Sequence, residues 1–166
     1  MSFPPIVGHS PRVLILGTMP SVKSLDVGQY YGHPQNSFWW IMSKIASFPM
    51  ELGYSERVAK VQEAGVCVWD VLSDCQRPGS LDANIVRDSE VPNDIASFLK
   101  KYPSISMLGF NGAASKAIYK RHNLLVDEAL GLCQLPSTSP AYASMKKEKK
   151  LDIWRNALMP HLNALK

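Results

Sequence analysis

The side chains best suited to chemistry in this sequence lie in two polar stretches. The first, Gly17–Asn36, carries two tyrosines, a histidine, an asparagine and two prolines. The second, Leu135–Ser144, places three hydroxyls between two prolines, on Ser137, Thr138 and Ser139. A stiff segment with this many hydrogen-bond donors is suited to holding phosphate oxygens. The density of aromatic, amide and imidazole groups in the first stretch is typical of a loop at an active site.

Each stretch also has an ordinary structural interpretation. Tyr30 and Tyr31 can pack on the core, and Asn36 can cap a helix that begins at Ser37. The second stretch can be a solvated turn. The lysine run behind it can be the wet face of a helix, and its members are Lys146, Lys147, Lys149 and Lys150. Residue types alone leave both interpretations open.

Several known catalytic and metal-binding patterns are missing from the sequence. The four histidines are scattered, with neither a His-Glu-x-x-His motif nor a pair four residues apart. Neither Ser137 nor Ser139 lies in a Gly-x-Ser-x-Gly turn, and Gly17 begins no phosphate-binding loop. The three cysteines are an odd number without Cys-x-x-Cys spacing, which argues against a disulfide framework and a four-thiolate metal site. We therefore expect neither a metal ion nor a cofactor.

Composition describes an ordinary globular chain. Its 166 residues are 46% hydrophobic and 19% charged, enough for one domain over residues 1–166. The 18 lysines and arginines exceed the 14 acidic residues, a balance compatible with a polyanionic partner but shared by many other domains. Apolar runs such as Val13–Leu16 are too short to cross a membrane, and Met1–Pro5 lacks the features of a signal peptide. We expect a cytoplasmic monomer without membrane contact.

Short apolar segments alternate with amphipathic ones along the chain. The expected strands are Arg12–Gly17, Val66–Asp70, Ile105–Gly109 and Leu132–Leu135. The expected helices are Ser37–Phe48, Ser55–Ala64 with Ser55 as its cap and Gly65 as its end, Pro92–Lys101, Ala113–Arg121 and Lys146–Leu158. This alternation predicts a three-layer α/β/α sandwich around a mostly parallel four-stranded sheet. Ligands of such sheets bind beyond the carboxyl ends of the strands, so the loops of interest are 17–36, 70–83, 109–112 and 136–145.

Three motifs, in order, resemble a known family. Gly17-Thr-Met-Pro-Ser21 with Tyr30-Tyr-Gly-His-Pro-Gln-Asn-Ser-Phe-Trp39 resembles the first active-site motif of the uracil-DNA glycosylase superfamily. Its hypoxanthine (deoxyinosine) DNA glycosylase branch is the most similar. Val66–Leu72 with Arg77–Asp82 resembles the second strand and loop of the family, and Leu135–Ala141 resembles its closing DNA-binding loop. The resemblance covers roughly residues 12–158.

The sequence departs from the usual uracil enzymes at two positions. Many members carry an Asp or Asn at the third position of the first motif, where this chain has Met19. Many also begin the closing loop with a catalytic histidine, where this chain has Leu135 or Ser137, depending on the alignment. The hypoxanthine branch shares both departures, and the resemblance implies that Asn36 is its catalytic residue.

The resemblance implies a monofunctional glycosylase that flips a deaminated base out of DNA and hydrolyses its N-glycosidic bond. Tyr31 would stack on the flipped base, and the main chain of Thr18 and Met19 would line the pocket. Asp70 would either accept a hydrogen bond from N1–H of hypoxanthine or hold the loop that follows it. Asn111 would face the pocket or cap the next helix.

The same resemblance predicts how the protein holds DNA. Ser137, Thr138 and Ser139 would contact the phosphates on either side of the extruded nucleotide, and Lys146 and Lys147 would add salt-sensitive attraction. Either an aromatic or a thioether side chain, Tyr142 or Met145, would fill the gap left in the base stack or would be buried against the last helix.

Three other functions remain open on the sequence. A mismatch-type uracil or thymine glycosylase would share the fold. A catalytically silent protein that binds damaged DNA or nucleotides would explain the loss of both usual catalytic residues. A small-molecule hydrolase could use a similar sheet, although the sequence offers neither a nucleophile nor a metal site for it.

Overall fold

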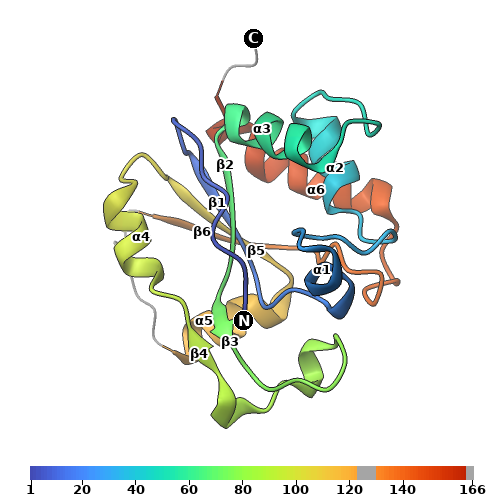
Figure 1. Cartoon of the computed structure of the whole chain (residues 1–166). Helices are drawn as coiled ribbons and strands as arrows, with labels where there is room; N and C mark the ends of the chain where they lie inside the picture. Colours follow the sequence, from blue (N-terminus) through green and yellow to red (C-terminus); the bar gives the residue numbers. More distant parts are fainter. Residues whose placement is uncertain (123–129, 164–166) are drawn as a thin grey trace.

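The fold is built on a central sheet of four parallel strands, as the sequence predicts (Figure 1). The computed structural model describes residues 1–122 and 130–163. The strands run in the spatial order β2-β1-β5-β6. Their bounds are β1 Val13–Gly17, β2 Val66–Asp70, β5 Met107–Asn111 and β6 Gly131–Leu135. The carboxyl ends of all four strands therefore meet at one edge.

Alternating side chains of the strands build two separate cores. Val13 and Ile15 of β1 join one hydrophobic cluster, whereas Leu14 and Leu16 join the other. All four are fully buried, because helices cover both faces of the sheet. The sheet is thus the middle of three layers, which confirms the predicted α/β/α architecture.

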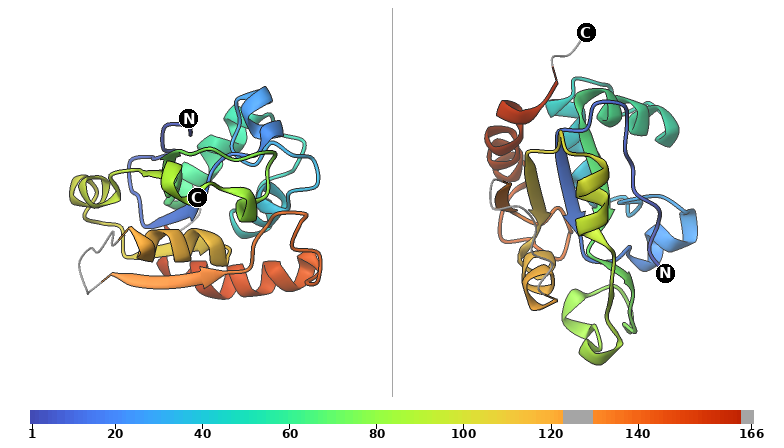
Figure 2. Two further views of the ribbon diagram at one scale, coloured as in Figure 1. Left: turned by 90° about the horizontal axis from the view of Figure 1, so that it is seen from below. Right: turned by 90° about the vertical axis from the view of Figure 1, so that its left-hand side faces the viewer.

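Helices form the outer layers on both faces of the sheet (Figure 2). Residues of α2, α3 and α6 belong to the core with Val13 and Ile15, and residues of α4 and α5 belong to the other core. The bounds are α2 Phe38–Ile45, α3 Tyr54–Ala64, α4 Ile95–Lys101, α5 Ala113–Arg121 and α6 Lys147–Leu158. The predicted inward face of α6 is confirmed, since Leu151, Trp154 and Leu158 are all buried.

Two predicted helix starts were wrong. The cap of α3 is Gly53, which makes no side-chain hydrogen bond, and Ser55 lies within the helix. Pro92 lies in a short strand, and α4 begins only at Ile95, because the Asp94 carboxylate accepts the Ser97 backbone N–H at 3.0 Å and fixes the start there.

Two further element boundaries differ from the predicted ones. Strand β5 begins two residues later than expected because Ile105 closes a turn, its N–H donating to the carbonyl of Tyr102 at 3.1 Å. This shift makes Asn111 the last residue of the strand. Helix α2 ends at Ile45 rather than at Phe48. The predicted end of α3 is confirmed, with Gly65 in the left-handed conformation at φ 88°.

The loops contain short elements that the sequence analysis did not predict. A six-residue helix, α1 Val22–Val27, interrupts the first polar loop, and Ser21 caps it by accepting the Ser24 N–H at 3.1 Å. After β2, two short strands pair antiparallel, β3 Leu72–Asp74 and β4 Val91–Pro92. The described residues also contain the 3₁₀ turns η1 Asp82–Asn84, η2 Arg87–Ser89 and η3 Met159–His161. Over residues 1–122 and 130–163, no helix is long and apolar enough to cross a membrane.

Candidate active site at the carboxyl edge of the sheet

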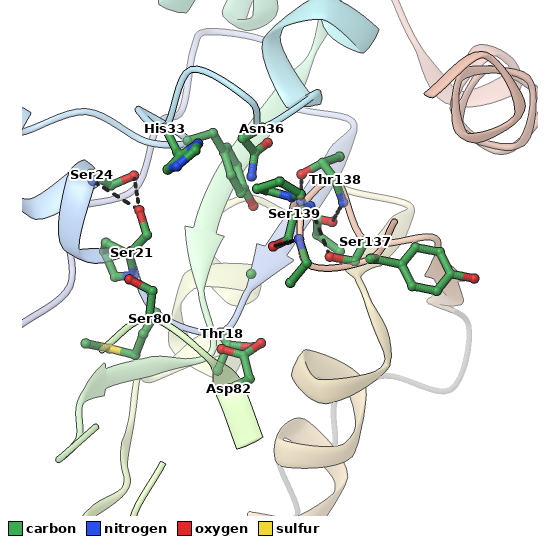
Figure 3. Close-up of a pocket in the computed structure, with 18 of the residues that line it drawn as sticks. Thr18, Ser21, Ser24, His33, Asn36, Ser80, Asp82, Ser137, Thr138 and Ser139 are labelled. Atoms are coloured by element: carbon green, nitrogen blue, oxygen red, sulfur yellow. Dashed lines mark hydrogen bonds between the residues drawn. The ribbon is translucent and has the colours of Figure 1, made fainter. Parts of the chain in front are cut away.

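A cavity of about 530 Å³ opens where the four strands end (Figure 3). This volume is within the range of small-molecule sites, about 300–1,000 Å³. All four predicted loops contribute to its wall, so the cavity lies where the sequence predicts the site. The predicted residues that line it are Thr18, Met19, Tyr31, Asn36, Asp70, Ser137, Thr138 and Ser139. The other two predicted residues, Lys146 and Lys147, do not line the cavity.

Gly17 allows two polar side chains to meet at the end of β1. A Cβ atom at this position would lie 2.6 Å from Asp70 Oδ1 and 3.0 Å from the Tyr31 hydroxyl. The sheet register explains the first contact, because Gly17 and Asp70 are directly paired across β1 and β2. A larger residue would therefore displace both side chains.

Asp70 Oδ2 and the Tyr31 hydroxyl are both buried without a hydrogen-bond partner, the two such side-chain atoms among the residues described. Buried polar atoms are nearly always paired, so two unpaired ones at a single cavity indicate a place for a polar ligand. Both side chains line the cavity.

Asp70 titrates far from its ordinary range. Burial and the nearby carboxylate of Asp82 raise its pKa to about 7, although the guanidinium of Arg77 opposes the shift. Burial also raises the pKa of the Tyr31 phenol above its ordinary value. Near neutral pH, Asp70 is therefore divided between its carboxylate and its acid, and Tyr31 keeps its proton.

Tyr31 lies in a backbone conformation that few residues other than glycine adopt, with φ at 52°. Its ring packs on Phe38 with ring centres 4.2 Å apart and an angle of 32° between the planes. Strained backbone of this kind occurs often at functional sites, where the surrounding structure holds it. Tyr30 is buried in the same core, and its hydroxyl donates to the carbonyl of Pro4 at 2.8 Å. The core interpretation thus holds for both tyrosines, and both also line the cavity.

Asn36 bonds to the start of α2 and faces the cavity at the same time. The N-cap position is Ser37, whose side chain makes no capping bond, and the Asn36 Oδ1 just before it accepts the N–H of Phe38, the first helical residue, at 2.9 Å. With the oxygen fixed on that donor, the amide nitrogen points into the cavity (Figure 3). The helix start therefore orients a donor toward any ligand held there.

The closing loop is fastened to the sheet through Thr138. This residue is only 1% exposed, and its N–H and hydroxyl both bond to the side chain of Asn111 at 3.0 Å. Its carbonyl accepts the Ser37 N–H, also at 3.0 Å. The buried hydroxyl of Thr138 is engaged within the protein, so Ser137 and Ser139 are the better-placed candidates for contact with DNA.

A glycine lets the closing loop approach the sheet. Gly112 has φ at 100°, and a Cβ there would lie 3.1 Å from the Cβ of Ser137. Asn111 does not cap α5, whose cap is Gly112, so that alternative was wrong.

The lysine run is divided between two environments. Lys150 is buried, and its ammonium donates to the carbonyl of Tyr142 at 2.9 Å. This bond joins helix α6 to the closing loop. Burial lowers the pKa of Lys150. Lys146 and Lys147 are exposed at the start of α6, and the Lys147 ammonium lies 4.4 Å from the centre of the Trp40 ring.

Three further wall residues were not singled out by the sequence analysis. His33, Ser80 and Asp82 line the cavity, and Thr18 and Asp82 lie side by side in Figure 3. All three belong to motifs that carry the family resemblance, His33 to Tyr30–Trp39 and the other two to Arg77–Asp82. Asn111 also lines the cavity, which is one of the two alternatives predicted for it. Within the described chain, no group of three His, Cys, Asp or Glu side chains is arranged to hold a metal ion.

Comparison with known proteins shows which family the chain resembles over most of its length. A family model for the uracil DNA glycosylase superfamily matches residues 4–162. The hypoxanthine DNA glycosylase of Methanosarcina barkeri is 32% identical over 114 residues, 68% of this chain and 71% of that protein. A hypoxanthine DNA glycosylase of Methanosarcina acetivorans is 32% identical over 111 residues, 66% of this chain and 69% of that protein.

A solved structure extends the similarity over nearly the whole fold. The solution structure of a candidate uracil DNA glycosylase from Methanosarcina acetivorans superposes with a TM-score of 0.76 at 26% identity. The alignment covers 93% of this chain and 95% of that chain. The chain therefore belongs to the uracil DNA glycosylase superfamily, as its motifs predict.

Proposed function

We propose that this protein is a monofunctional DNA glycosylase that flips a deaminated base, preferably hypoxanthine, out of DNA. It hydrolyses the N-glycosidic bond of that nucleotide and leaves an abasic site for base excision repair. The observation that carries this proposal is one cavity walled by the Tyr31 ring, the Asp70 carboxyl and the Asn36 amide. Tyr31 and Asn36 lie in the loop between α1 and α2, and Asp70 ends β2; together they offer a stacking surface, a donor and a hydrogen-bond acceptor.

A flipped purine would use each of these groups differently. The exposed face of Tyr31, supported from behind by Phe38, would stack on the base. The unpaired oxygen of Asp70 would accept the N1–H of hypoxanthine, which supplies the missing partner of a buried polar atom. Adenine has no hydrogen at N1, so the same oxygen would reject the undamaged base.

The chemistry needs little acid or base strength from the protein. Cleavage passes through a cationic sugar and a departing anionic base, and preorganised hydrogen bonds stabilise both. The Asn36 amide is held in place by its capping bond to Phe38, so its N–H groups can donate to the base or sugar, and the free lone pair of its oxygen can position the attacking water. Among the described residues, the cavity wall contains no lysine that could form a Schiff base with the sugar, which favours simple hydrolysis.

The names of the relatives support hypoxanthine as the substrate. Two proteins at 32% identity are named hypoxanthine DNA glycosylase. Uracil is the second candidate, because the structural relative is named for uracil and because uracil also presents a ring N–H that Asp70 could accept.

A panel of substrates separates these functions. Duplexes that each contain one hypoxanthine, uracil, xanthine or mismatched thymine are incubated with the protein, with and without a chelator. Abasic sites are then cleaved with alkali. We expect release of hypoxanthine in both conditions and slow or absent release of uracil.

Equal or faster uracil release would favour the mismatch-type enzyme and contradict the proposed preference. Tight binding of damaged DNA without release of any base would identify a silent damage-binding protein. Strict dependence on an added metal ion would contradict the proposed mechanism.

A further inference from the structure

Lys150 is a buried cation that the proposed chemistry does not use. It lies on helix α6 and is only 4% exposed. Lysine is almost never buried this far unless an anion pairs with it, because removing an ammonium from water is costly. Among the described residues, however, Lys150 forms no ion pair. Its ammonium is therefore held in this part of the protein without a counter-charge.

Backbone carbonyls surround the ammonium instead. It donates to the carbonyl of Tyr142 at 2.9 Å and to that of Ser139 at 3.5 Å. The Tyr142 ring lies 5.0 Å away and adds a cation–π contact. Ser139 and Tyr142 are the two ends of one turn, because the Tyr142 N–H donates to the Ser139 carbonyl at 3.1 Å. Lys150 thus draws the carbonyl oxygens of this Ser139–Tyr142 turn toward helix α6.

The same turn forms part of the cavity wall. All of its residues, 139–142, line the cavity, as does Ser137 just before it. The hydroxyls of Ser137 and Ser139 accept the backbone N–H groups of Ser139 and Ala141, each at 3.2 Å. Each hydroxyl therefore keeps its own proton to donate to a ligand. Hydroxyl donors with a cation behind them are suited to an anionic ligand.

Fastening the loop to helix α6 does not require a charge. Trp154, one helical turn beyond Lys150, fastens the same loop with a neutral group, since its indole N–H donates to the Pro136 carbonyl at 2.9 Å. Burying a charge costs more free energy than burying a neutral donor that makes the same bond. The charge of Lys150 therefore needs an explanation beyond its two hydrogen bonds.

We propose that the Lys150 ammonium is the counter-charge for one DNA phosphate beside the flipped nucleotide, which it stabilises through the Ser139–Tyr142 turn. The inference rests on the proposed function and gives Lys150 a positioning role without direct contact with DNA. Its carbonyl bonds hold two negatively polarised oxygens away from the phosphate. Its charge attracts the phosphate through protein rather than through bulk water, where the attraction would be weaker.

A thermodynamic cycle between the side chain and the phosphate tests the proposal. Wild type and Lys150→Gln are titrated with duplexes that carry hypoxanthine on a 2′-fluorinated sugar, which resists cleavage. The duplexes have either natural phosphates or one neutral methylphosphonate, placed in turn at each of the two phosphates on either side of the target. Glutamine keeps a donor for the Tyr142 carbonyl and removes the charge.

We expect Lys150→Gln to bind the natural duplex about tenfold more weakly, the order of one charge pair near a protein surface. With the methylphosphonate at the one phosphate that Lys150 stabilises, wild type and variant should differ by less than about twofold, because no charge is left to attract. At the other positions the tenfold difference should persist. A lysine that only fastened the loop would not show this dependence on position.

Two further variants serve as controls. Lys149→Gln removes the same charge from the neighbouring, exposed position of α6. Its effect on affinity should stay within about twofold and should not depend on which phosphate is neutral. Lys150→Met removes both the charge and the donor, and it should show the same dependence on phosphate position as Lys150→Gln. Thermal melting of each variant shows whether folding is intact.

The outcomes separate the counter-charge from the function on which it rests. An equal loss of affinity for every duplex, or unchanged affinity of Lys150→Gln for the natural duplex, would overturn the counter-charge. The binding cycle requires no cleavage. A wild type that shows the expected coupling but releases no base from cleavable duplexes would support the counter-charge and overturn the glycosylase.

Discussion

Asn111 and Thr138 are joined by a pair of hydrogen bonds, both 3.0 Å long. The amide oxygen of Asn111 accepts the Thr138 backbone N–H, and its amide nitrogen donates to the Thr138 hydroxyl. One side chain at the end of β5 thus satisfies two polar groups of the closing loop. The Thr138 carbonyl also accepts a hydrogen bond from the Ser37 N–H. Strand β5 and the start of helix α2 therefore both hold the closing loop.

Asn111→Ala should therefore loosen the closing loop. Two polar groups of Thr138 would lose their partners, and unpaired buried groups cost about 1–3 kcal/mol each. Urea unfolding should show a loss of that order, and hypoxanthine release from duplex should slow. Thr138→Val keeps the backbone N–H bond and removes only the hydroxyl, so its loss should be smaller. Equal stability of Asn111→Ala and wild type would show that the pair does not hold the loop.

A second prediction separates the two roles of Asn36. Asn36→Ala loses both the cap and the donor, whereas Asn36→Asp keeps an oxygen for the Phe38 N–H and loses the amide nitrogen. Both variants should slow single-turnover cleavage by about 10²-fold or more, the scale for one preorganised donor. Only Asn36→Ala should lose about 1 kcal/mol of stability through the cap. Near-normal cleavage by Asn36→Asp would reduce Asn36 to a helix cap.

The sheet could be predicted from the sequence because its strands are short, apolar and buried on both faces. Val13–Leu16 has no polar residue, so its burial left little choice of structure. The position of the cavity followed from the parallel topology alone. Element starts were less predictable where a distant or local polar contact decides them, as at Asp94, whose carboxylate sets the start of α4 and excludes Pro92 from it.

The pairing of site residues could not be predicted because it depends on three-dimensional contacts. Thr138 and Asn111 are 27 positions apart, and nothing in either local pattern indicates that they bond. The burial of Lys150 within an otherwise exposed lysine run is similar, because the acceptor is a carbonyl of the folded closing loop. Met19 and Asn36 could be singled out only because the motif resembled a family.

The exposed lysines at the start of α6 lead to a prediction about the affinity of the protein for DNA. Replacing Lys146 and Lys147 together with Ala should weaken binding to damaged and undamaged duplexes alike, because phosphate contacts carry no base information. The dependence of affinity on salt should also become less steep, since fewer counterions are released. The matched control is Lys116→Ala with Lys120→Ala on α5, since neither lysine lines the cavity. Unchanged affinity at low salt in the first double variant would show that these lysines are only solvated.

Asp70 should control the pH dependence of cleavage. If its carboxylate accepts N1–H of the base, release of hypoxanthine should rise with pH and level off above about 7, the pKa to which burial raises this group. Asp70→Asn should be slower and should lose this inflection. A wild-type profile that Asp70→Asn reproduces in shape would show that the residue holds its loop without reading the base.

The same carboxyl should also make stability depend on pH, in the direction opposite to an ordinary paired aspartate. Its ordinary pKa of 3.8 applies to the unfolded chain, and burial raises it to about 7 in the folded protein. Between these values the folded state binds the proton more tightly, so the free energy of unfolding falls as the pH rises. The difference between 3.8 and about 7 corresponds to about 4 kcal/mol, lost in full above pH 7. Asp70→Asn carries no such charge, so its stability relative to wild type should grow between pH 4 and pH 8 by an amount of that order.

Urea unfolding of both proteins at several pH values measures this growth, and all other titrating groups cancel in the difference. Asp82→Asn provides the control, because removal of the neighbouring carboxylate should lower the pKa of Asp70 and move the loss of stability to lower pH. A difference between wild type and Asp70→Asn that stays constant across the range would mean that Asp70 keeps an ordinary pKa. In that case Asp70 would be ionised over most of this pH range, and its burial beside Asp82 would not raise its pKa.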